Sequence, residues 1–285
     1  MANPALKAAI ARKDFILAPG IYDLISALIA DRMGFPALYV TGYGTVASSL
    51  GLPDAGIATY SDMLGRIAQM ARMTETPIIA DADTGYGGLL NVHHTVRGYE
   101  AAGVSAIQLE DQVFPKKCGH TPARQVVPSD EMVRKIQVAV DSRQSDDFLV
   151  IARTDARTAH GLDEAIRRAV AYGEAGADLI FVESPESVDE MARIGREIDR
   201  PLIANMVNGG RTPLLPADEL QALGFAVAIH PAAGFLSAAA ALQTAYADLE
   251  ANGINTNRTE LYSFADFNQL IGFEDVWAFD RRYAV

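Results

Sequence analysis

The stretch Ser105-Ala-Ile-Gln-Leu-Glu-Asp-Gln-Val-Phe-Pro-Lys-Lys-Cys-Gly-His120 begins as an apolar run and ends in a loop of reactive groups. The run Ser105–Leu109 reads as a buried strand. The eleven residues from Glu110 to His120 then hold a carboxylate, two lysines, the only cysteine and an imidazole. A solvated surface loop that holds this mixture by chance is the plain alternative, so the question is whether other segments converge on the same place.

Apolar runs that end in polar residues recur along the whole chain. Upstream of the quoted stretch the predicted strands are 13–19, 37–41 and 77–83, and the later strands end near Glu110, Arg153, Glu183, Asn205 and His230. Helices are predicted at 23–33, 61–73 (capped by Ser61), 91–102, 129–143, 162–175, 187–198, 217–223 and 232–251. The segment Gly42-Tyr-Gly-Thr45 is read as a loop. A glycine often stands just before the next strand, where a left-handed helix cap is wanted.

This alternation of strands and helices predicts the fold class and the domain division. Eight strands alternating with eight helices favour a single (β/α)8 TIM barrel over a doubly wound sheet. The barrel is expected to occupy residues 1–251. Residues 252–285 lie beyond the eighth unit and hold an apolar, aromatic extra helix. That helix either packs on the side of its own barrel or docks on a neighbouring subunit.

Composition excludes several classes of protein. One cysteine in 285 residues rules out an intrachain disulfide framework, which fits a reducing, cytoplasmic setting. The net charge of −12 argues against a nucleic-acid partner. The first residues show no signal-peptide stretch, and no apolar run of about eighteen residues is present to span a membrane.

Polar residues at the strand ends are the candidate site. In a barrel, these positions converge on one mouth. Here they are Tyr39, Thr41, Asp81, Asp83, Glu110, Arg153, Glu183 and Asn205, and the loop after the second strand adds Asp54. Five carboxylates beside one arginine are costly without a cation. Hard oxygen ligands suit Mg²⁺ or Mn²⁺, with one or two carboxylates in direct contact and the others holding water.

Each of these residues also has a plainer interpretation. Asp81 or Asp83 could cap a helix, Glu183 could simply end a strand, and Arg153 could pair structurally with Asp155. Two neighbouring histidines, 93 and 94, are better explained as surface or packing residues than as ligands. It is the convergence of the whole set that favours a site.

Such a set supports chemistry on 2-oxo or 2-hydroxy acids. A divalent ion can chelate the acid, polarise its oxygen and stabilise an enolate that develops during C–C cleavage. Arg153 and the backbone N–H groups of 41–43 are placed to hold carboxylates. Cys118 lies between Lys117 and Gly119, and a thiol on a glycine-hinged loop suits proton transfer to or from carbon. A covalent role is less favoured, because no separate base is visible.

From Ala18 to Phe279 the chain resembles the isocitrate lyase / phosphoenolpyruvate mutase superfamily. The motifs that carry the resemblance are Leu50-Gly-Leu-Pro-Asp54, Asp81-Ala-Asp-Thr-Gly-Tyr-Gly87, the Glu110–His120 loop, Ala152-Arg-Thr-Asp-Ala156 and Ala204–Pro213. The Lys-Lys-Cys-Gly-His segment is similar to the lyase branch and its relatives: 2-methylisocitrate lyase, 2,3-dimethylmalate lyase, the oxaloacetate hydrolases and carboxyphosphonoenolpyruvate mutase.

The resemblance implies a role for each site residue. Asp81 would ligate Mg²⁺ directly, with Asp83, Asp54 and Glu110 acting largely through its waters. The substrate would be bound by Tyr39, Thr41, Gly42, Tyr43, Gly119 and Asn205, with Arg153 and Glu183 orienting it. Cys118 would be the acid that protonates the released enolate, and Lys116 and His120 would lie on the gating loop. The family implies a homotetramer whose C-terminal helices swap between neighbours.

Three departures from the family pattern keep the substrate open. Tyr43 stands where a glycine is usual, and Thr121-Pro-Ala-Arg-Gln125 lacks a lysine often found there. His230-Pro231 ends the eighth strand, where the oxaloacetate hydrolases usually carry a serine. We therefore expect a Mg²⁺-dependent lyase that cleaves 2-methylisocitrate or a substituted malate into a 2-oxo acid such as pyruvate and a carboxylic acid. Hydrolysis of oxaloacetate, a phosphonomutase and an idle barrel used for binding are the alternatives.

Overall fold

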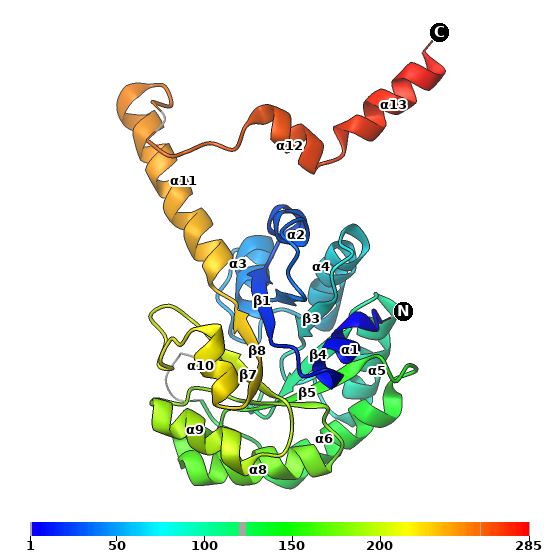
Figure 1. Cartoon of the computed structure of the whole chain (residues 1–285), viewed down its shortest axis with the longest axis vertical. Coiled ribbons are helices and arrows are strands. Elements are labelled where there is room, and N and C mark those ends of the chain that lie inside the picture. Colours follow the sequence, from blue (N-terminus) through cyan, green and yellow to red (C-terminus); the bar gives the residue numbers. More distant parts are fainter. Residues whose placement is uncertain (1, 120–123, 257, 285) are drawn as a thin grey trace. The chain divides into compact units, whose positions relative to one another are not determined.

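A computed structural model describes residues 2–119, 124–256 and 258–284, and within them the strands close into a parallel barrel (Figure 1). The barrel order is β1-β2-β3-β4-β5-β6-β7-β8, with β8 pairing back onto β1. The strands are β1 Ile16–Ile21, β2 Leu38–Val40, β3 Ile78–Asp81, β4 Ala106–Glu110, β5 Leu149–Thr154, β6 Leu179–Val182, β7 Leu202–Asn205 and β8 Phe225–His230. The predicted TIM barrel is confirmed.

Helices alternate with the strands and lie around the barrel (Figure 1), except the first, which precedes β1 and adds Leu6 and Ala9 to the interior cluster. They are α1 Ala5–Ala11, α2 Leu24–Asp31, α3 Gly42–Leu50, α4 Tyr60–Met73, α5 Leu89–Ala101, α6 Ser129–Ser142, α7 Ala156–His160, α8 Leu162–Glu174, α9 Val188–Glu197 and α10 Ala217–Ala222. The C-terminal helices are α11 Ala233–Asn252, α12 Phe264–Leu270 and α13 Phe273–Tyr283.

Three local predictions were wrong. The segment read as a loop at 42–45 is the first turn of α3. The cap of α4 is Thr59 rather than Ser61, because the Thr59 side chain accepts the Asp62 N–H and Asp62 bonds back to the Thr59 backbone, which forms a capping box. The single extra helix near the C-terminus is two helices, separated at Gly272, whose φ of 86° lies in the left-handed region.

Two apolar clusters show which way each strand residue faces. One fills the barrel interior and includes Tyr39, Ile79, Ile151, Phe181 and Ile203. The other lies between the strands and the surrounding helices, and alternate strand residues belong to it. Because successive strand side chains point to opposite faces, each residue two positions after an interior one also faces the interior. This alternation places the polar strand-end residues inside the mouth.

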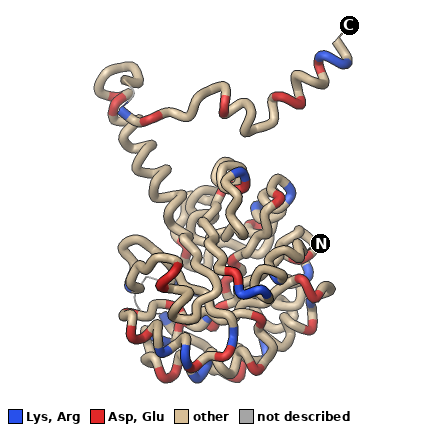
Figure 2. Tube along the Cα trace, viewed as in Figure 1, with Lys and Arg blue, Asp and Glu red and all other residues tan. Residues whose placement is uncertain are grey.

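Contacts divide the chain into two compact units, 1–233 and 234–285. The sequence instead predicts a domain boundary after residue 251, which leaves α11 with the barrel. That domain boundary stays a prediction. The first fifteen residues of α11 carry no charged side chain (Figure 2). Asp248 is the buried residue of this helix. No helix of the described residues is long and apolar enough to cross a membrane.

Candidate active site

The barrel mouth collects the polar residues that the sequence places at the strand ends. Asp81, Glu110, Arg153, Glu183 and Asn205 each stand two residues after an interior or inward-facing position of their strand, and all are buried. β4 and β5 align Glu110 beside Arg153. The parallel register of the strands therefore brings these side chains together at one mouth, as the sequence predicts.

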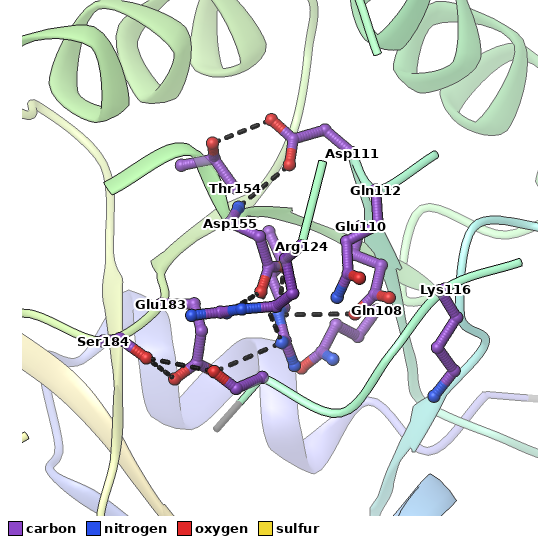
Figure 3. A network of polar contacts seen from close by, with 12 residues as sticks. Gln108, Glu110, Asp111, Gln112, Lys116, Arg124, Thr154, Asp155, Glu183 and Ser184 are labelled. Atoms are coloured by element: carbon purple, nitrogen blue, oxygen red, sulfur yellow. Dashed lines mark hydrogen bonds and ion pairs between the residues drawn. The ribbon is translucent and has the colours of Figure 1, made fainter. Parts of the chain in front are cut away.

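Arg153 contacts three carboxylates, whose residues Glu110, Asp155 and Glu183 are labelled in Figure 3. Its Nε and Nη2 donate to Asp155 Oδ2 and Oδ1, each at 2.9 Å, in a bidentate pair. The same guanidinium is 3.4 Å from Glu110 Oε2 and 3.4 Å from Glu183 Oε2. The structural pairing with Asp155 thus exists alongside an orientation into the mouth, and the role of Arg153 in substrate binding stays a prediction.

Lys116 bridges two carboxylates on the other side of the mouth. Its buried Nζ is 2.5 Å from Asp54 Oδ1 and 2.7 Å from Asp83 Oδ1. Burial works to lower the pKa of Lys116, but the carboxylates of Asp83 and Glu110 outweigh it and hold that pKa well above its usual value. Lys116 is therefore a fixed positive charge within the acidic cluster.

The loop that carries Cys118 lies against the mouth. Gly119 is so close to the site that a Cβ added there would stand 2.5 Å from Arg153 Nη2 and 2.9 Å from Glu183 Cδ. Ser184 donates its hydroxyl to Gly119 O at 3.3 Å. Cys118, which is partly buried, precedes Gly119 in this loop. His120 lies outside the described residues.

Of the residues expected to bind substrate, Gly42 lies against Asp81 and the others lie elsewhere around the mouth. A Cβ on Gly42 would stand 2.6 Å from Asp81 Oδ2, so the start of α3 lies directly on that carboxylate. Thr41 precedes this turn and is buried, whereas Tyr43 is exposed. Tyr39 faces the interior, and its hydroxyl donates to Gln108 Oε1 at 3.2 Å. Across the mouth, Asn205 Nδ2 donates to Glu183 Oε2 at 3.1 Å.

Two residues of the site, Gln108 and Arg124, escaped sequence reasoning. Gln108 links Tyr39 to Asp81, since its Nε2 is 3.5 Å from Asp81 Oδ1. Arg124 makes a buried ion pair with Asp155 and donates to Thr158 Oγ1 at 2.6 Å, so its guanidinium already bonds to groups of the protein. A polar residue in the middle of an apolar strand was the available signal for Gln108.

Backbone strain marks the same place. Asp83 and Ser184, which follow β3 and β6, have φ values of 49° and 59°. Non-glycine residues adopt this left-handed region at a cost, and such residues cluster at functional sites. The strain therefore supports the mouth as the working end of the barrel.

The donor set of the mouth fits a hard divalent cation. Burial raises the pKa of Asp83 to about 7 against the opposing effect of Lys116, and burial likewise raises the pKa of Glu110. Glu110 Oε1 is buried and has no hydrogen-bond partner among the described residues. Within the same residues, no group of three or more His, Cys, Asp or Glu side chains is spaced to hold a metal directly. Buried carboxylates with raised pKa values, and an unpartnered Glu110 oxygen, suit a bound cation that would offset the cost of burying their charge.

Fold and mouth together define a (β/α)8-barrel enzyme. The family model described as phosphoenolpyruvate phosphomutase matches residues 6–250. A 2,3-dimethylmalate lyase of Eubacterium barkeri is 48% identical over 273 residues, which is 95% of this chain and 94% of that protein. A 2-methylisocitrate lyase of Aeropyrum pernix is 40% identical over 271 residues, covering 95% and 87%.

Solved structures agree with this placement. A 2,3-dimethylmalate lyase matches with a TM-score of 0.92 and 37% identity, over 100% of this chain and 96% of that one. An oxaloacetate acetylhydrolase bound to 3,3-difluorooxalacetate gives 0.92 and 34%, over 99% and 98%. A phosphonopyruvate hydrolase in complex with oxalate and Mg²⁺ gives 0.89 and 31%, over 100% of both. The chain belongs to the phosphoenolpyruvate mutase / isocitrate lyase superfamily.

Proposed function

We propose that the protein is a Mg²⁺-dependent carbon–carbon lyase. Its substrate is a 2-hydroxy di- or tricarboxylate of the substituted-malate or 2-methylisocitrate type, and its products are a 2-oxo acid such as pyruvate and a carboxylic acid. The observation that carries the proposal is the meeting of three groups at one mouth: Asp81 under the first turn of α3, Arg153, and the Cys118–Gly119 segment. The similarity to 2,3-dimethylmalate lyase supports this class of substrate.

Each group has a distinct task in the proposed site. Bound Mg²⁺ would supply Lewis-acid polarisation of the 2-oxygen, and Asp81, Asp83, Asp54 and Glu110 would hold it directly or through water. Gly42 begins α3 beside Asp81, and the N–H groups at the start of a helix suit a substrate carboxylate. Arg153 suits a second carboxylate.

The proposed reaction breaks the bond between C2 and C3 of the substrate. The 2-hydroxyl gives its proton to solvent and becomes the ketone oxygen, while the electron pair of the broken bond passes to C3. The thiol of Cys118 then gives its proton to C3, which leaves a saturated carboxylic acid and a thiolate that solvent reprotonates. Contact of Gly119 with Arg153 and Glu183 supports this placement of Cys118.

A substrate panel tests the proposal. Purified protein with Mg²⁺ is incubated with 2-methylisocitrate, 2,3-dimethylmalate and other substituted malates, and 2-oxo acid release is followed. We expect release from at least one acid and none after chelation of the metal. Absence of a 2-oxo acid from the whole panel would reject the lyase.

Hydrolysis of oxaloacetate is the second candidate, because a solved oxaloacetate acetylhydrolase has the same fold. The end of β8 weighs against hydrolysis. His230 is followed by Pro231, whereas the resemblance to those hydrolases implies a serine there. Acetate released from oxaloacetate above the background of spontaneous decarboxylation would favour hydrolysis. Phosphorus NMR on a phosphonate substrate tests the mutase alternative in the same way.

We further propose a homotetramer in which the C-terminal segment of one subunit docks on another. The support is the aromatic surface of that segment: Phe264, Trp277, Phe279 and Tyr283 are exposed in the single chain. Burial of such groups is a strong driving force for association. Light scattering on the full chain tests this assembly, and a monomer at micromolar concentration would reject it.

A further inference from the structure

A buried carboxylate behind the mouth has no place in the chemistry described so far. Glu110 and Asp111 are neighbours at the end of β4, so their side chains face opposite sides of the barrel wall. Glu110 faces the mouth, whereas Asp111 is fully buried toward α8, where Tyr172 Oη and Arg168 Nη1 donate to its Oδ2 at 2.8 and 3.1 Å. Asp111 therefore cannot touch a substrate.

The other contacts of Asp111 are with the end of β5. Its Oδ1 accepts the backbone N–H of Asp155 at 2.9 Å, and its Oδ2 accepts the Thr154 hydroxyl at 2.8 Å (Figure 3). In addition, the Asp111 N–H donates to Arg153 O at 3.2 Å. One buried side chain thus holds the Thr154 hydroxyl and the Asp155 backbone, in the two residues that follow Arg153.

Asp155 behaves unlike an ordinary helix cap. It stands at the N-cap of α7, where aspartate usually accepts a hydrogen bond from the helix backbone, yet its side chain makes no capping bond. Both of its oxygens are used on arginines instead. They form the bidentate pair with Arg153 and the buried ion pair with Arg124, the first described residue after the Cys118 loop. The Asp155 N–H, meanwhile, is held by Asp111.

We propose that Asp111 is a positioning residue, which orients Asp155 and through it the guanidinium of Arg153. Fixing the Asp155 backbone from behind the barrel turns its carboxylate toward Arg153, so that Arg153 presents one defined geometry to a substrate carboxylate. Loss of this support would leave Arg153 between three acidic neighbours with no preferred partner. The inference rests on the proposed function in taking Arg153 as the substrate-binding arginine.

The chain offers a matched control. Asp178 performs a similar structural task at the opposite end of β5, where its Oδ2 accepts the Val150 N–H and pairs with Arg143 Nη1, each at 2.8 Å. Asp178→Asn therefore disturbs the same strand without reaching the mouth. We expect Asp111→Asn and Asp178→Asn both to lower the melting temperature, and only Asp111→Asn to lower kcat/KM, by about tenfold or more.

A double-mutant cycle shows whether Asp111 acts through Asp155. In an Asp155→Asn background, Asp111→Asn should change kcat/KM by less than about twofold, because the relay is already broken. Thr154→Val, which removes a single donor to Asp111, provides a gentler second variant if Asp111→Asn does not fold. We expect it to lose about threefold in kcat/KM, and to lose nothing further in the Asp155→Asn background.

Oxalate binding in the presence of Mg²⁺, measured by calorimetry, separates failure of this inference from failure of the proposed function. If wild-type protein cleaves no acid, the lyase is rejected, and oxalate affinity serves as the readout of Arg153 geometry in the same variants. The inference is overturned if Asp111→Asn or Thr154→Val matches wild type in the operative readout. It is equally overturned if the losses from Asp111→Asn and Asp155→Asn add.

Discussion

The side-chain amide of Gln112 brackets the backbone of Lys117. Gln112 Nε2 donates to Lys117 O at 2.8 Å, and Gln112 Oε1 accepts the Lys117 N–H at 3.0 Å. The residue immediately before Cys118 is thus tied to the end of β4 by a side chain rather than by sheet pairing. Gln112 fixes where the loop leaves the barrel, and with it the approach of the thiol.

Gln112→Ala is expected to lower kcat by about tenfold or more, because small displacements of a reacting group are costly. The free energy of unfolding should fall by only about 1 kcal/mol, the usual net worth of a hydrogen bond. Gln125→Ala, at an exposed position of the same loop, is the control and should retain wild-type turnover. Steady-state kinetics and denaturant titration check both effects. A Gln112 variant with normal kcat would show that the bracket is not needed.

Cys118→Ser should reduce kcat far more than it weakens substrate binding. A hydroxyl is a much poorer proton donor than a thiol, and loss of a positioned acid costs about 10²–10⁴ in rate. Binding should persist, because Arg153 and the α3 turn are untouched. Comparison of kcat with the dissociation constant of oxalate measures the split. Equal losses in both quantities would remove Cys118 from the proton-transfer step.

Gly119→Ala should disable the site without unfolding the protein. The new methyl group would meet Arg153 Nη2 at 2.5 Å, so the loop must move away from the mouth. Gly65→Ala is a suitable control, since Gly65 lies at an exposed position of α4 and nothing lies within 4 Å of its added Cβ. There the change should stabilise by about 0.5–1 kcal/mol and leave kcat unchanged. Wild-type kcat/KM in the Gly119 variant would mean that the loop contact is dispensable.

Magnesium should raise the melting temperature of the protein. Asp81, Asp83, Asp54 and Glu110 crowd one mouth, and a ligand that binds only the folded state at 100 times its dissociation constant stabilises by about 2.7 kcal/mol. For a chain of this size that corresponds to roughly 5–10 °C. Asp81→Asn should abolish the shift, and Asp218→Asn, at an exposed position of α10, should keep it. Differential scanning fluorimetry with chelator and Mg²⁺ checks this.

Much of the fold and the outline of the site were predictable because both follow from repeated local patterns. Strands such as β5 are continuous apolar runs, and their polar last residues must meet at one mouth once the barrel closes. The burial of Asp81, Glu110 and Arg153 together follows from this rule alone. The catalytic and binding roles of these residues stay predictions.

The partners of those residues were not predictable. Whether Arg153 faces Asp155, Glu110 or Glu183 depends on register and on side-chain packing, and the structure shows that it faces all three. Asp111 stood next to a recognised site residue, but its partner Tyr172 is sixty-one positions away. The start of α3 at Gly42 was missed because two glycines in four residues usually signal a loop.

Lys116 makes the folding of the protein less dependent on divalent ions in solution. Its ammonium group lies between Asp54 and Asp83 and offsets part of the repulsion among the carboxylates of the mouth. Newly synthesised protein is therefore expected to reach its native shape in a medium stripped of divalent ions and to acquire its metal afterwards. For the proposed Mg²⁺-dependent lyase, we therefore expect folding and activation to be separate events, with the ion needed only for the second.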